Sequence, residues 1–233
     1  MVSTRRRPIM QPAKRQSHNA MTTQTATIVR EISGMPDVDH VHGLAFDGER
    51  LWVATGPSLV ALDPATGDVE RRLPVAADAG TTFDGKYLYQ LVDARIDKID
   101  PTSGEVVSSI PAPGDGSGSG MAWAEGWLWV GQYKNRKIHQ VDPATGKIER
   151  TLDSNRFVTG VTWEDGELWH GTWEDEQSEI RRIDAETGEV RQSLSMPPGQ
   201  VVTGLAADGE VFYCGGGSSG KVRVVERPSE AAQ

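Results

Sequence analysis

Cysteine is almost absent from this chain, which has 233 residues and a single cysteine, Cys214. One cysteine cannot form an intramolecular disulfide, and it cannot supply the thiolate cluster of a structural zinc or iron–sulfur site. A cysteine-poor protein suits a reducing compartment. The sequence therefore favours the cytoplasm, and a secreted protein with few cysteines stays open as the alternative.

Long apolar runs and positive charge are also scarce. No stretch approaches the roughly 18 apolar residues of a membrane-spanning helix. The net charge is −9, and the first 20 residues hold five of the 24 basic residues and none of the 33 acidic ones. The rest of the chain keeps 19 basic and 33 acidic residues, a net charge of −14. Binding to nucleic acid or to an anionic membrane requires a basic face. The acidic charge of the body therefore argues against both kinds of partner.

The first 20 residues form a basic tail without the apolar run and cleavage site of a signal peptide. Three interpretations stay open: a transit-like arm, a disordered tail, and a start codon upstream of a natural start at Met21. The third is slightly favoured, since Met21 lies just before the first patterned segment. We predict a basic disordered tail over residues 1–24, one domain over residues 25–228, and a disordered C-terminus over residues 229–233.

What the chain does contain is a repeat. Five segments share one layout, and each begins with a glycine that precedes an apolar residue. Successive leading glycines are 37, 40, 40 and 44 residues apart, which is the period of four-stranded propeller blades. These glycines are Gly43, Gly80, Gly120, Gly160 and Gly204.

Turn chemistry divides each segment into strands. An acidic residue followed by glycine, as at Asp47-Gly48, predicts a tight hairpin turn after the first strand. The motif Asp-Pro-x-x-Gly, as at Asp63, predicts a turn after the third, because proline presets φ and glycine accepts the left-handed region. An aromatic residue recurs on the second strand and is expected to pack blade against blade. The recurring residues are Trp52, Tyr89, Trp129, Trp169 and Phe212.

The fifth segment stops after its third strand. Residues 27–33 have the alternating pattern of a fourth strand and closely match residues 147–153. We therefore predict an all-β protein, a five-bladed β-propeller of four-stranded blades, in which an N-terminal strand completes the last blade. This closure would remove an exposed sheet edge.

Function is expected where the repeats differ, at the mouth of the central channel. The residue before each leading glycine should ring that mouth. We predict an axial pocket for a small molecule, with His42 as a catalytic acid or base and Glu174 and Lys134 as its partners from the loops above. The predicted substrate-binding residues are His40, Ser119, Tyr133, Thr159, Trp173 and Thr203.

Histidine spacing suggests one candidate metal site, although no cofactor is required by the pattern. His40 and His42 are two residues apart and should share one face of an extended chain, where Asp78 or Glu174 could add a third ligand for a divalent ion. His139 is expected to be exposed to solvent, and His170 to pack between blades. Cys214 is expected to be a small buried thiol.

These features resemble the glutamine-cyclotransferase propellers over roughly residues 25–227. The resemblance lies in five blades, the glycine-led inner strands, an aromatic residue on the second strand and closure by the N-terminus. It implies an enzyme that cyclises N-terminal glutamine to pyroglutamate with loss of ammonia. The retained positions include Gly43-Leu44 in the first blade and Trp173 in the fourth.

The catalytic positions of that family are occupied differently here. Its second-blade catalytic glutamate falls on Ala79, its fourth-blade carboxylates fall on residues 159–162 without an acid, and its catalytic lysine falls near Gly216. These losses argue against cyclotransferase activity. Two hypotheses follow: a repurposed small-molecule pocket, with lyase or cyclase chemistry by acid–base catalysis, and a non-catalytic propeller that binds a protein or peptide through its rim loops. The sequence leaves the oligomeric state open.

Overall fold

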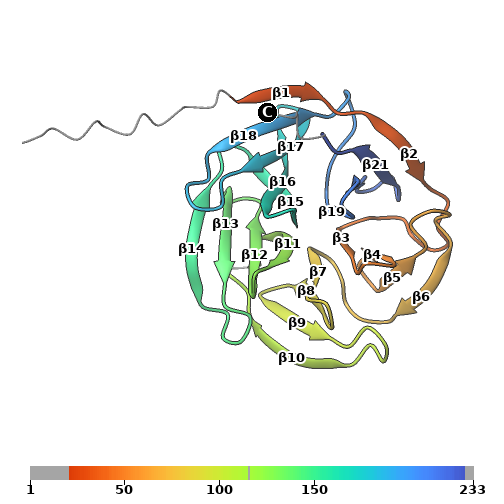
Figure 1. The fold of residues 1–233 in the computed structure, drawn as a ribbon. Helices are drawn as coiled ribbons and strands as arrows, with labels where there is room; N and C mark the ends of the chain where they lie inside the picture. Colours follow the sequence, from red (N-terminus) through yellow and green to blue (C-terminus); the bar gives the residue numbers. More distant parts are fainter. Residues whose placement is uncertain (1–20, 115, 229–233) are drawn as a thin grey trace, which may run out of the picture.

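Five β-sheets form a ring around a central axis (Figure 1). The computed structural model describes residues 21–114 and 116–228, so the predictions for residues 1–20 and 229–233 lie outside it. The predicted five-bladed β-propeller is confirmed, and no described residue belongs to a helix that could cross a membrane.

The strands follow the chain blade by blade, from the axis outward. Blade 1 holds β3 (Gly43–Phe46), β4 (Leu51–Ala54), β5 (Leu59–Leu62) and β6 (Val69–Leu73). Blade 2 holds β7 (Thr81–Phe83), β8 (Leu88–Val92), β9 (Arg95–Ile99) and β10 (Val106–Pro111). Blade 3 holds β11 (Gly118–Ala124), β12 (Trp127–Gln132), β13 (Lys137–Val141) and β14 (Ile148–Asp153). Blade 4 holds β15 (Phe157–Glu164), β16 (Glu167–Glu174), β17 (Gln177–Ile183) and β18 (Val190–Ser195). Blade 5 holds β19 (Leu205–Ala207), β20 (Val211–Gly215), β21 (Val222–Glu226) and β2 (Ile28–Ile32).

The second strand of each blade lies between two neighbouring blades. Every residue of β4 and of β8 is buried, whereas β6 and β10 on the rim are mostly exposed. A strand that is covered on both faces reads as a continuous apolar run, because neither face meets water. Burying one leucine side chain in this way stabilises a protein by about 1.5–3 kcal/mol.

Aromatic residues join four of the five pairs of neighbouring blades, as the repeat predicts. In blade 5, however, the register aligns Ala206 with Tyr213, so Tyr213 is the equivalent of Trp52 and the expectation for Phe212 is wrong by one residue. Phe212 instead packs against Trp169 of blade 4. In the other contacts the partner of the second-strand aromatic residue comes from a first strand, but the first strand of blade 5 has Ala207 at that position. The ring centroids are 6.2 Å apart for Phe46–Tyr213, 5.6 Å for Tyr89–Trp123, 5.9 Å for Trp129–Trp163 and 4.9 Å for Trp169–Phe212.

The N-terminal strand closes the ring as predicted. β2 pairs antiparallel with β21 and places Ile32 opposite Val222. Ile32 is buried in the core of blades 1 and 5. Lys221 Nζ lies 2.8 Å from Glu31 Oε1, but both side chains are more than a third exposed, so this pair adds little. Arg30 also donates to the carbonyl oxygens of Pro64 and Ala65 in blade 1, but these contacts are exposed, so closure depends mainly on the backbone ladder and on Ile32.

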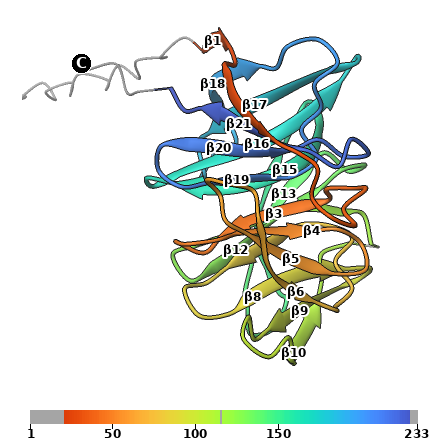
Figure 2. The same cartoon turned by 90° about the vertical axis from the view of Figure 1, so that its right-hand side faces the viewer.

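A second N-terminal strand was not predicted. β1 (Thr22–Thr25) pairs in parallel with β18 and makes blade 4 five-stranded. Figure 2 shows β1 above β18, with the chain running on toward blade 5. The expected domain boundary at residue 25 is therefore three residues too late. All four residues of β1 are exposed, so the segment has no apolar alternation by which its sequence could indicate a strand.

The five leading glycines form a closed ring at the axis. A Cβ atom on Gly80 would lie 2.6 Å from the carbonyl carbon of Gly120, and one on Gly204 would lie 3.0 Å from Cα of Gly43. The first distance is shorter than real Cβ contacts, and the second is tighter than most of them, so glycine lets the inner strands approach this closely without displacement. The side chains on either side of this ring line two separate axial cavities.

Candidate functional site

The axial pocket occupies one end of the channel, next to the glycine ring, and has a volume of about 320 Å³. It brings together seven of the ten residues singled out from the sequence. The pocket is lined by His40, Val41, His42, Asp78, Ala79, Gly118, Ser119, Tyr133, Thr159, Thr203 and Gly217.

Three hydroxyl groups lie at equivalent places in blades 3, 4 and 5. Each belongs to the residue before a leading glycine, and each lies against a glycine of the second strand in its own blade. A Cβ on that glycine would lie 2.7–3.1 Å from the hydroxyl oxygen, so these glycines make room for the hydroxyl groups. The pairs are Ser119 with Gly131, Thr159 with Gly171 and Thr203 with Gly215.

Only one of these hydroxyl groups has its own partners. Thr203 Oγ1 donates to the carbonyl oxygen of Val41 at 2.6 Å and accepts from the amide of Gly217 at 3.0 Å. Ser119 Oγ and Thr159 Oγ1 are buried and have no hydrogen-bond partner among the described residues. An unpaired buried polar group costs about 1–3 kcal/mol. These two hydroxyl groups therefore have unused hydrogen-bonding capacity in residues that line the pocket.

The two histidines of the pocket stack on each other. The ring centroids of His40 and His42 are 5.7 Å apart and the ring planes differ by 11°. Burial lowers the pKa of the half-buried His42, the charge of His40 lowers it further, and Asp78 opposes both. The His42 imidazole is therefore neutral at pH 7 and able to accept a proton.

The candidate metal site is not assembled. Across residues 21–114 and 116–228, no group of three or more His, Cys, Asp or Glu side chains is placed to hold a metal ion. His40, His42 and Asp78 line one pocket, but they do not meet as a ligand cluster.

Three predicted residues lie outside the axial pocket. Glu174 accepts a hydrogen bond from Arg136 Nη2 at 3.0 Å and is not among the residues that line the pocket. Lys134 is exposed on the hairpin after β12, and Trp173 pairs across β15–β16 with Phe157. The proposed partnership of His42 with Glu174 and Lys134 is therefore not formed. The loop sequence does not reveal how far from the axis each hairpin extends.

One aromatic contact at the pocket was not predicted. Tyr133, which lines the pocket, stacks on Phe157 of blade 4 with ring centroids 4.7 Å apart. The guanidinium carbon of Arg136 lies 4.3 Å from the centroid of Phe157. Phe157 lies at the start of a first strand, a position outside the repeat motifs, so no sequence signal distinguished it.

Two other reactive residues, Cys214 and His139, are structural. Cys214 is fully buried, and burial raises the pKa of its thiol, as expected for an inert core residue. His139 is only 6% exposed, so the expected exposure is wrong. Its ring nitrogens lie 2.8 Å from Thr151 Oγ1 and 2.9 Å from Gln132 Oε1. Hydrogen bonds on both nitrogens allow this imidazole to be buried.

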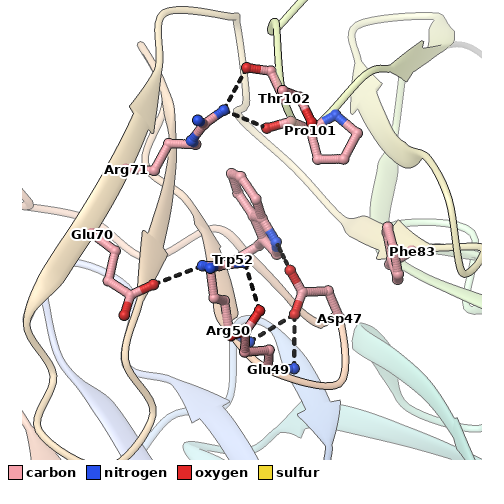
Figure 3. Close-up of a pocket in the computed structure, with 9 residues that line it drawn as sticks. All are labelled: Asp47, Glu49, Arg50, Trp52, Glu70, Arg71, Phe83, Pro101 and Thr102. Carbon is pink, nitrogen blue, oxygen red and sulfur yellow. Dashed lines mark hydrogen bonds and ion pairs between the residues drawn. The ribbon is translucent and has the colours of Figure 1, made fainter.

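A larger cavity, of about 550 Å³, lies between blades 1 and 2 (Figure 3). Trp52 Nε1 donates to Asp47 Oδ2 at 2.7 Å, and Arg50 Nε donates to Glu70 Oε2 at 2.6 Å. Arg71 donates to two backbone carbonyl groups of blade 2. None of the described side chains that line this cavity has a buried polar atom without a partner. The axial pocket is the better candidate because two residues in its lining, Ser119 and Thr159, have buried hydroxyl groups without a partner.

Fold and pocket together define a β-propeller with an axial pocket whose wall carries histidine and hydroxyl side chains. A family model described as outer membrane protein assembly factor BamB, PQQ_2, matches residues 92–229, from blade 2 to the end of blade 5. This match covers more than half of the chain, and the protein belongs to that family. No curated protein matches the sequence.

Two solved structures are similar in fold. Glutaminyl cyclase from Myxococcus xanthus is 18% identical, with a TM-score of 0.71, and the match covers 88% of this chain and 97% of that one. A chain of the mitotic checkpoint complex is 16% identical, with a TM-score of 0.50, covering 81% of this chain and 64% of that one. At these identities the likeness shows the fold alone.

Proposed function

We propose that the axial pocket binds a small molecule that carries a carbonyl or carboxylate oxygen, and that His42 performs acid–base chemistry on it. The observation that carries this proposal is the pair of buried, unpartnered hydroxyl groups on Ser119 and Thr159 in the wall of a pocket that also contains His42. A free hydroxyl group donates one hydrogen bond and accepts others, so it matches an oxygen acceptor well.

The chemistry would use three groups. Neutral His42 would remove a proton from the substrate, and the hydroxyl groups of Ser119 and Thr159 would donate to the oxygen on which negative charge develops. This division of roles suits an elimination or a cyclisation, the chemistry of lyases and cyclases. It would proceed in the cytoplasm, where the single thiol of Cys214 stays reduced.

Glutamine cyclisation is the specific reaction suggested by the similar structure from Myxococcus xanthus, a glutaminyl cyclase. The pocket here has Ala79 where the resemblance implies the catalytic glutamate. We therefore propose the scaffold with a different substrate. Incubating residues 21–233 with peptides that begin with glutamine, and measuring loss of ammonia by mass spectrometry, should give only the uncatalysed rate. Pyroglutamate above that rate would show that the reaction survives with different residues.

The pocket itself is tested by ligand binding. A panel of small carbonyl and carboxylate compounds is screened by thermal shift against the wild-type protein and the Thr159→Val variant. Compounds that stabilise the wild type should bind the variant several-fold more weakly, because valine keeps the shape of threonine and removes one hydrogen bond. Equal binding by both proteins would remove Thr159 from the site.

A second candidate function is a non-catalytic assembly role. The family description, an outer membrane protein assembly factor, favours it. In that case a protein or peptide would contact the rim loops around Tyr133 and Phe157, and small carbonyl compounds would not stabilise the protein. The same thermal-shift screen therefore separates the two functions.

A further inference from the structure

A second cavity lies between blades 3 and 4, away from the axial pocket. Its volume is about 180 Å³. Ile138 and Leu152 of blade 3 and Ile183 and Val190 of blade 4 form apolar walls, and His170 of β16 is part of the lining. His170 is only 1% exposed. Asp153, Ser154, Asn155 and Gly188 complete the lining, and the Asp153 side chain is largely exposed. The cavity therefore combines apolar walls, a polar edge and one deeply buried imidazole.

His170 is where blade 4 departs from its repeat. It follows the aromatic residue of the second strand, and the equivalent residues are Val53, Gln90, Val130 and Cys214. Gln90 uses its amide to donate to two carbonyl groups, those of Ala79 and Leu91. His170 Nδ1 is buried and has no hydrogen-bond partner among the described residues. Packing alone would be served by valine, as in blades 1 and 3.

We propose that this cavity is a second binding site, which takes a neutral compound of one ring that carries a hydroxyl group. An apolar protein cavity of about 150 Å³ is large enough for benzene, so the volume here suits a single ring. A hydroxyl group can donate or accept, so it satisfies His170 Nδ1 in either tautomer. Asp153 at the edge of the cavity disfavours an anion, and any charged compound would lose its hydration against the four apolar side chains. Burial also disfavours the charged form of His170 and so lowers its pKa to about 3, which keeps the imidazole neutral.

Phenol and benzene are suitable probes, because they have the same ring and differ by one hydroxyl group. Binding to the whole protein is measured by titration calorimetry and by the shift in melting temperature. The wild type should bind phenol about fivefold more tightly than benzene, the preference expected of one net hydrogen bond. The His170→Val variant places the residue of blades 1 and 3 in blade 4, and it should lose this preference. An unchanged preference in the variant, or no binding of either probe to the wild type, overturns the proposal.

A second variant tests the cavity without changing His170. Val190→Phe should fill the cavity and abolish binding of both probes. The matched control is Val106→Phe, because Val106 pairs with Ile99 in blade 2 as Val190 pairs with Ile183 in blade 4. Val106 is exposed and lies outside the cavity, so this control should bind as the wild type does.

Amide chemical shifts then locate the bound phenol. Saturation should move the amide signals of His170, Asn155 and Gly188, which line the cavity, and leave those of His42 and Ser119 in the axial pocket unchanged. Shifts confined to the axial pocket would place phenol there and overturn the proposal.

Discussion

Gly171 makes room for the hydroxyl group of Thr159: a Cβ atom on Gly171 would lie only 2.7 Å from Thr159 Oγ1. The two residues belong to neighbouring strands of blade 4, and the close contact holds the threonine side chain beside the axial pocket. Because Gly171 has no side chain, Thr159 can occupy the space beside it. Substitution of Gly171 therefore tests this contact.

The Gly171→Ala variant should be destabilised by about 1–3 kcal/mol, because the added methyl group overlaps Thr159 and also Val202 Cγ1 at 2.8 Å. Adding Thr159→Ala to this variant should restore part of the loss, since it removes one of the two overlapping groups. Chemical denaturation of the two single variants and the double variant gives the coupling energy. Additive effects would mean that the two residues do not share this contact.

The hydroxyl groups of Thr159 and Thr203 should differ in what they contribute to stability. Thr159→Val should leave the free energy of unfolding unchanged or raise it by about 1 kcal/mol, because it removes a buried hydroxyl group that has no partner. Thr203→Val should lower it by about 1–3 kcal/mol, because it removes the partner of both Val41 and Gly217. Urea unfolding of the matched pair measures both. A loss of stability in Thr159→Val would indicate a partner that the structure does not contain.

Acid should destabilise the protein through His170. Burial lowers its pKa from 6.5 to about 3, and the charge of Arg181 acts in the same direction. The unfolded chain therefore binds a proton that the folded chain does not, so this contribution is complete above pH 6.5 and is lost as the pH falls toward 3. The loss between pH 7 and pH 5 is about 2 kcal/mol.

The comparison for this effect is His170→Val. Its free energy of unfolding, measured by urea at a series of pH values, should fall about 2 kcal/mol less than that of the wild type between pH 7 and pH 5. Parallel pH profiles for the two proteins would mean that His170 takes up its proton in the folded state.

Ring closure should depend on Ile32 rather than on the exposed face of β2. Ile32→Ala should cost about 2–4 kcal/mol, because the side chain is buried and Ile32 Cγ2 packs against Gly67 of blade 1. Val29→Ala on the same strand should change stability by less than about 0.5 kcal/mol, since Val29 is 54% exposed. Thermal unfolding compares the two variants, and equal effects would contradict the predicted role of Ile32.

Removal of metal ions tests the remaining hypothesis for His40 and His42. EDTA should leave the melting temperature unchanged, because the described residues provide no third ligand beside the two stacked rings. A fall in the melting temperature that zinc or manganese reverses would show that these histidines hold an ion in solution.

The repeat architecture was predictable because it depends on local chemistry. The turn at Asp63 formed as expected: Asp63 Oδ1 accepts from the amides of Ala65 and Thr66, and Gly67 adopts a φ of 81°. Such turns recur every 37 to 42 residues and need no distant contact, so the blades could be counted. The closing strand could be recognised because it carries the same alternation as the other fourth strands.

The register within a blade was harder to predict. The sequence pattern favoured Phe212 as the aromatic residue of blade 5, whereas strand pairing selects Tyr213, whose hydroxyl group donates to Asp208 Oδ2. The distance from the leading glycine separates them, because it is nine residues in blades 1 to 4 and nine residues from Gly204 to Tyr213. The position of Tyr213 opposite Ala206, and its packing on Phe46 of blade 1, agree with that count.

By itself, the sequence determined the class of fold, the number of blades, the closure of the ring and the residues that surround the axis. These features depend on turns that recur in every blade and on the leading glycines, which allow the inner strands to approach one another closely. The tertiary structure decided which rim residues meet. It left Lys134, Trp173 and Glu174 outside the pocket to which the sequence had assigned them. The physical reason is that distance from the axis depends on strand length and on packing between blades, and neither is encoded within a single repeat.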